Sequence, residues 1–270
     1  ITSIDDNNKY KFKLTPNNSG TNQISITNAK DVNNFIYSLF TSGNLTFNAL
    51  LIPDIWLDAS HSSLLYSGST LISWGSRSGT STITNNFQTS ITVNTSSLNG
   101  MNTIYLNSSN ANNINNGFNI TAGNISNTYT FFIVMKIQNY SGPYNGGFII
   151  APYPNTTWNH CYGDYLQNGK NFVVYNGGLR TPVAISDTLP TQWFIAEVSS
   201  APNDATSFYR VGQNQHTHIG SSSIFSGISL GGLGGHNCDC HVAEFRYYNR
   251  RLDTTDHASE LSALKTKWGI

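Results

Sequence analysis

Short apolar runs dominate the chain from about residue 50 onward. The runs are rich in β-branched and aromatic side chains and are bounded by Gly, Asn, Pro or Ser, a pattern typical of β-strands joined by turns. No helical pattern separates them, so we expect an all-β fold in which two antiparallel sheets pack face to face as a sandwich. The predicted strands lie at 69–74, 89–94, 102–107, 129–138, 146–151, 170–176, 192–200, 206–212, 226–232 and 241–249.

Residues 1–48 differ from this pattern. Short alternating stretches predict strands at 9–16 and 23–28, and residues 29–40 have the apolar spacing of one helix face. We therefore expect an N-terminal extension over 1–48 and a main domain over 49–270. The helix packs either on its own domain or on a partner chain, and in the second case it would join copies of the chain into a homo-oligomer. Its apolar face consists of Val32, Phe35, Ile36, Leu39 and Phe40.

The end of the chain, residues 254–270, predicts a helix in this otherwise β pattern. Thr254 or Thr255 can cap its first turn. Its buried face would be the stripe of His257, Leu261, Leu264 and Trp268.

Charge excludes some classes of partner. The chain has 14 basic and 14 acidic residues, so its net charge is zero and it lacks the basic footprint of a nucleic-acid-binding protein. Apolar runs such as 131–135 are far too short to cross a bilayer, so we expect no membrane insertion.

Three segments, in order, resemble the LamG-like jelly-roll domains of the concanavalin A-like lectin/glucanase superfamily. They are "PDIWLDASHSSLLYSGSTLISWGSRSGT" (53–80), "NTYTFFIVMKI" (127–137) and "LGGLGGHNCDCHVAEFRYYNRRLDTTDHASELSALKTKWGI" (230–270). The resemblance covers residues from about 50 to 270 and implies a two-sheet jelly-roll sandwich with neighbouring termini. It implies no single function, because members serve as glycan-binding, adhesive or structural modules and some relatives are glycosidases.

Hydrolysis by a related glucanase would need carboxyl groups on one strand that point into one groove. This chain has three glutamates, Glu197, Glu244 and Glu260, and no two share a predicted strand, so we expect no enzymatic activity. In the family's matching positions Asp58 and Glu244 look structural. A buried acid paired with Arg246 or Arg250 is the interpretation we favour.

The cysteines permit three interpretations. If 236–245 forms one strand, His236, Cys238 and Cys240 share a face. Cys161, Cys238 and Cys240 could be free packed thiols, or two of them could form one disulfide. Alternatively, Cys161, His236, Cys238 and Cys240 could be the ligands of a structural zinc ion.

The most ligand-like segment is the stretch 151–171, which we expect to be a long loop. Sugars offer apolar C–H faces to aromatic rings and hydroxyl groups to amides and carboxylates, and this segment mixes both kinds of side chain. Alternatively, its aromatic residues cap one end of the sandwich. The candidate carbohydrate-binding residues are Tyr153, Trp158, Asn159, Tyr162, Asp164 and Tyr165.

These observations favour a non-enzymatic module that recognises a cell-surface glycan or protein for adhesion or host attachment. The Asn-, Ser- and Thr-rich composition fits an appendage of a phage or large virus, located outside the cell or on the virion surface. A capsid or fibre component that binds only its neighbouring subunits is the alternative.

Overall fold

The chain divides into two units, Ile1–Leu50 and Leu51–Ile270. In the first unit, β1 (Ser3–Ile4) pairs antiparallel with β2 (Tyr10–Lys11). The helix expected over 29–40 lies outside the described residues. The computed structural model describes residues 3–4, 10–11, 51–78, 82–84, 91–106, 118–139, 148–152, 161–165, 171–176, 179–182, 192–211, 214–220, 225–233, 236–237 and 239–270.

Each strand predicted from residue 50 onward overlaps an observed one, whereas the strand predicted at 23–28 lies outside the described residues. The predicted strands correspond to β5 (Thr70–Trp74), β7 (Thr92–Leu98), β8 (Met101–Leu106), β10 (Tyr129–Asn139), β11 (Phe148–Pro152), β13 (Asn171–Asn176), β15 (Phe194–Ser200), β16 (Ser207–Val211), β18 (Phe225–Leu230) and β21 (Asp239–Tyr248).

Further strands escape the pattern because they are short or poor in apolar residues. One of them corrects an expectation: β12 lies inside 151–171, which is therefore not a continuous loop. Its sequence CYGDY contains Gly and Asp, which are depleted in strands, but β11 and β13 pair with it on both sides and hold it extended. The additional strands are β3 (Ile55–Asp58), β4 (Leu64–Ser67), β6 (Thr82–Thr84), β9 (Phe118–Ile125), β12 (Cys161–Tyr165), β14 (Leu179–Pro182), β17 (Asn214–His218), β19 (Gly232–Leu233) and β20 (His236–Asn237).

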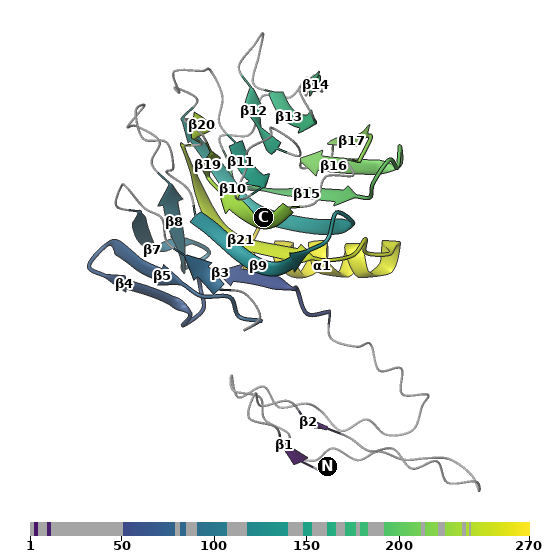
Figure 1. Ribbon diagram of the computed structural model, residues 1–270. Coiled ribbons are helices and arrows are strands. Elements are labelled where there is room, and N and C mark those ends of the chain that lie inside the picture. Colours follow the sequence, from purple (N-terminus) through teal and green to yellow (C-terminus); the bar gives the residue numbers. More distant parts are fainter. Residues whose placement is uncertain are drawn as a thin grey trace, which may run out of the picture. The chain divides into compact units, whose positions relative to one another are not determined.

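The strands of the second unit form two sheets (Figure 1). The 10-stranded sheet has the order β17-β16-β15-β10-β21-β8-β7-β5-β4, with β3 pairing β21, and the 9-stranded sheet has the order β14-β13-β12-β11-β18-β9-β6, with β19 and β20 beside it. Pairing is antiparallel throughout the described strands except between β11 and β20. The all-β sandwich expected from the sequence is confirmed.

Strand β10 explains the apolar run at 131–135. Phe131 and Ile133 belong to the core that both sheets share, whereas Phe132 and Val134 belong to a second cluster under the C-terminal helix. Because both faces of β10 are covered, its sequence is continuously apolar rather than alternating.

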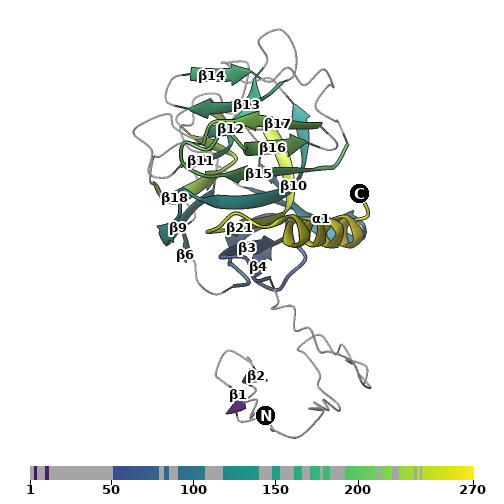
Figure 2. The same ribbon diagram turned by 90° about the vertical axis from the view of Figure 1, so that its right-hand side faces the viewer.

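Helix α1 (Thr254–Trp268) lies along β21 in both views (Figures 1 and 2). The expected cap at Thr254 or Thr255 is wrong by one or two positions, because the Asp253 carboxylate accepts the Thr255 and Asp256 N–H groups. Leu264 and Trp268 of the predicted stripe are buried against the sheet, whereas Leu261 is only partly buried and Glu260 takes a buried position. Gly269 ends the helix with a φ of 69°.

Within the described residues, no helix is long and apolar enough to cross a membrane.

A buried acid lies beneath this helix. Glu197 of β15 is only 1% exposed, and burial raises its pKa from 4.5 to about 7 even though Arg210 lies 2.7 Å from its Oε1 atom. His257 of α1 lies 3.4 Å from Oε2, and burial lowers its pKa to about 4. Both groups therefore favour their uncharged forms in the folded protein.

We expect the substitution Glu197→Gln to stabilise the protein more at pH 8 than at pH 5. The unfolded chain releases the Glu197 proton near pH 4.5 and the folded chain only near pH 7, so wild-type stability falls as the pH rises between these values. Glutamine does not ionise, so the variant does not lose this stability as the pH rises. Thermal unfolding at both pH values measures the effect, with Asp256→Asn as an exposed control; a Tm difference that does not change with pH contradicts the prediction.

Candidate functional site

Two buried carboxylates lie side by side on neighbouring strands. Glu244 of β21 is directly opposite Asp58 of β3 in the strand register, and the exposed fraction of each residue is 0%. A pair of acids at the centre of a fold is the first place to look for hydrolytic chemistry, so the partners of both groups decide what they can do.

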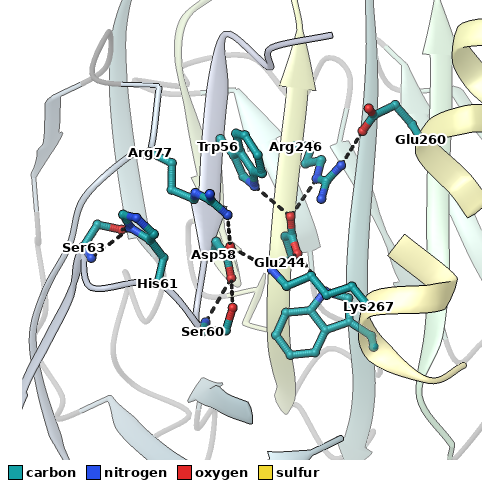
Figure 3. A network of polar contacts seen from close by, with 11 residues as sticks. Trp56, Asp58, Ser60, His61, Ser63, Arg77, Glu244, Arg246, Glu260 and Lys267 are labelled. Carbon is teal, nitrogen blue, oxygen red and sulfur yellow. Dashed lines mark hydrogen bonds and ion pairs between the residues drawn. The ribbon is translucent and has the colours of Figure 1, made fainter. Parts of the chain in front are cut away.

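Each carboxylate oxygen of Glu244 accepts two hydrogen bonds (Figure 3). Its Oε1 atom accepts the Trp56 indole N–H at 2.7 Å and the Arg246 Nε–H at 2.6 Å. Its Oε2 atom accepts the Lys267 ammonium at 2.7 Å and the Trp268 indole N–H at 2.7 Å. Two cations and two indole N–H groups thus bind the two oxygens of this carboxyl group.

Asp58 is held in the same way (Figure 3). Its Oδ1 atom accepts the Ser60 N–H at 3.0 Å and the Ser60 hydroxyl at 2.6 Å, and its Oδ2 atom lies 2.6 Å from Arg77 and 2.7 Å from Lys267. Burial alone would raise the pKa of Asp58, but Lys267, Ser60 and Arg77 hold it below its usual value. Asp58 therefore stays ionised.

This network joins the two ends of the second unit. Its donors come from β3 and the turn after it, from Arg77, from β21 and from the last turn of α1, and Arg246 extends it to Glu260 of the same helix at 2.5 Å. The expected pairing of a buried acid with Arg246 is found for Glu244, whereas Asp58 pairs with Arg77 and Lys267, and Arg250 lies 3.4 Å from Asp256. Carboxylates with every oxygen engaged are poor acids or bases, so the network holds the fold together and offers no hydrolytic pair.

Sequence reasoning did not assign the donors Trp56, Lys267 and Trp268. Each lies within a segment that carries the family resemblance, Trp56 beside Asp58 and the other two in the closing helix. The family resemblance therefore pointed to the segments that hold these donors, but the sequence alone does not show that the two segments meet.

The candidate carbohydrate-binding residues divide into two groups. Tyr162, Asp164 and Tyr165 lie on β12, where Tyr162 is opposite Val174 and Asp164 opposite Phe172. The remaining candidates, Tyr153, Trp158 and Asn159, lie outside the described residues.

The candidate zinc ligands do not lie on a single strand. His236 is on β20 at the 9-stranded sheet, whereas Cys240 is on β21 in the 10-stranded sheet, so the chain changes sheet between them and the shared face expected for 236–240 does not exist. Cys161 lies on β12, and Cys238 is outside the described residues.

Cys240 is fully buried in the core that both sheets share, in the manner of a packed thiol. No cluster of three or more potential metal ligands occurs in the described part of the chain. The zinc site remains a prediction that depends on the side chains of Cys161, His236 and Cys238.

No protein-family profile matches the sequence, and no curated protein does either. Several solved structures are similar. One is domain 4 of AbnA, a GH43 extracellular arabinanase from Geobacillus stearothermophilus, in complex with arabinotriose: identity is 14% and the TM-score 0.50, over 78% of this chain and 98% of that one.

Binding domains of botulinum neurotoxins are also similar. For the serotype D/C VPI 5993 binding domain the identity is 13% and the TM-score 0.52, over 78% of this chain and 52% of that one. For the type G receptor binding domain the identity is 14% and the TM-score 0.50, over 79% of this chain and 51% of that one. The chain thus spans about half the length of these toxin domains. At such identities the likeness shows the fold alone, an antiparallel β-sandwich.

We expect Glu244→Gln to destabilise the protein by about 3–5 kcal/mol, because a neutral amide removes one of the two counter-charges of Arg246 and of Lys267 and presents an NH₂ group to N–H donors. Urea unfolding measures the loss. Asp256→Asn, which removes the exposed ion pair between Asp256 and Arg250 at the start of α1, should cost less than about 1 kcal/mol. Equal effects of the two substitutions would show that the Glu244 network does not hold the fold together.

Proposed function

We propose that this protein is a non-enzymatic recognition module that binds a surface glycan or protein, in the service of adhesion or host attachment. The observation that carries the proposal is the sandwich fold, which the chain shares over nearly the whole length of a domain solved with arabinotriose bound. The toxin domains of the same fold are described as binding or receptor binding domains.

The state of the buried acids supports a binding role. Glu244 and Asp58 are engaged by cations, hydroxyl groups and indoles, so the chemistry that glycosidases need is missing from the centre of the fold. The ligand would be held by the 153–165 region, where Tyr162 and Asp164 lie on β12 and the aromatic residues Tyr153 and Trp158 precede that strand in the sequence.

The proposal includes a setting for the module. The second unit would be a LamG-like domain displayed outside the cell or on a virion, and residues 1–48 would link copies of the chain. This setting is supported by the closing segment 230–270, which resembles that family, and by the division of the chain at Leu50 and Leu51.

We expect purified protein to bind selectively on a glycan array and Trp158→Ala to abolish most of that binding, because the indole would supply the stacking surface for a sugar ring. Tyr66→Ala is the matched control, since Tyr66 is an exposed aromatic residue on β4, in the other sheet. A uniformly blank array would contradict glycan binding and favour the alternative of a structural capsid or fibre subunit.

A further inference from the structure

Strand β4 ends the 10-stranded sheet, and we call its residues 64–67 the β4 edge. It pairs antiparallel with β5, and no strand in the described part of the chain pairs with its other side. Figure 1 shows the β4–β5 hairpin at the edge of the sheet. The outer backbone N–H and C=O groups of an edge strand lack ladder partners, so they can pair with a strand of another molecule.

The side chains of this hairpin are divided between core and surface. Leu64 of β4 and Leu71 and Trp74 of β5 are buried in the core that both sheets share. Leu65 of β4 is 54% exposed, and Ile72 of β5 is 57% exposed. The register shift in the hairpin places its extra residue, Ile72, on β5, so β4 itself stays continuously extended. The sheet therefore ends in a regular strand beside exposed aliphatic side chains.

The hairpin lacks the devices that commonly keep an edge strand from pairing, which are charged side chains and proline. Residues 60–75 contain no Asp, Glu, Lys, Arg or Pro. Burial, followed by the charge of Arg77, lowers the pKa of His61, the only basic group in this range, so its ring is neutral at physiological pH. By contrast, β14 at the end of the 9-stranded sheet contains Arg180 and Pro182.

This neutrality determines which partner fits. Two copies of the β4 edge can meet without placing like charges opposite each other, whereas two copies of β14 would bring two arginines together. A twofold contact uses the same patch on both molecules, and an extended strand can pair antiparallel with itself across such an axis.

We propose that the β4 edge binds the β4 edge of a second copy of the chain, antiparallel across a twofold axis. The two 10-stranded sheets then form one continuous sheet, and the contact covers Leu65 of both copies. This inference goes beyond the proposed function, because it concerns a contact between copies of the second unit and neither the ligand nor residues 1–48.

A second copy fits this edge better than a lipid surface does. Exposed aliphatic side chains can also enter a bilayer, but hydrocarbon offers no hydrogen-bonding groups to the outer backbone of β4. The hairpin also has no lysine or arginine to attract anionic headgroups. An added strand, by contrast, pairs with the backbone groups and covers Leu65 at the same time.

The short length of β4 makes this contact weak and reversible. A contact between strands of four residues is small beside the roughly 1,000 Å² that a stable interface buries. Association should therefore depend on the protein concentration.

The test is sedimentation equilibrium of the full chain over about a hundredfold range of concentration. We expect the average molar mass to rise with concentration. Leu65→Lys, which places a charge on the edge, should raise the concentration needed for half-association by about tenfold or more. Ile219→Lys is the matched control and should associate as wild type does, because Ile219 is 62% exposed and follows β17 at the opposite end of the same sheet.

Two further measurements keep the test decisive. Both lysine variants retain residues 1–48, so their comparison with wild type isolates the β4 edge from any contact made by that extension. Backbone pairing should slow amide hydrogen exchange of residues 64–67 at high protein concentration in wild type but not in Leu65→Lys. Leu65→Thr keeps a neutral residue that favours strands and should associate better than Leu65→Lys, and melting temperatures show whether each variant is folded.

Every other outcome overturns the inference. A molar mass that does not rise shows that the edge does not self-associate. Association that Leu65→Lys leaves unchanged, that only Ile219→Lys weakens, or that leaves the exchange of residues 64–67 unaltered assigns the contact to another surface. Sedimentation of a non-associating chain with phosphatidylcholine vesicles, abolished by Leu65→Lys, would assign the hairpin to a membrane instead. The glycan array decides the proposed function separately.

Discussion

The buried carboxylate of Glu244 is the contact on which the arrangement of the second unit depends. A carboxyl group with no exposed surface must find donors inside the protein, and Glu244 receives them from β3, from its own strand and from the last turn of α1. These hydrogen bonds therefore hold the last turn of α1 against β3 and β21. The same group links residues more than 180 positions apart in the sequence, since the Trp56 and Glu244 hydrogen bond has a separation of 188.

Helix α1 also covers part of the outer face of the 10-stranded sheet. By covering the outer side of β10 and β21, it converts a strand pair with one buried face into one with two. On the same face the Tyr105 and His241 rings stack, and Trp193 packs both on His241 and on the apolar cluster under the helix.

Sequence patterns predicted the strands wherever apolar residues were frequent, because burial in a sandwich demands them at alternate positions. They failed at β12, where neighbouring strands supply the pairing that CYGDY does not itself favour, and at the helix cap, where Asp253 and Thr254 are adjacent residues with similar capping ability.

The candidate sites were harder to predict from the sequence for a physical reason. The β12 residues could be proposed because they are close in sequence. The donors of Glu244 come from distant segments, which only the folded chain brings together. The β4 edge leaves no pattern in the sequence, because only the strand order shows that β4 ends its sheet.

The closeness of β3 to the end of α1 has a mechanical consequence. A force that pulled residues 51 and 270 apart would act first on the β3–β21 pairing and on the contacts of Lys267 and Trp268 with Glu244. Because β21 is an inner strand of the 10-stranded sheet, that sheet would carry the load, whereas the 9-stranded sheet lies outside this line. A domain built in this way would lengthen at one sheet under tension while the other sheet kept its shape.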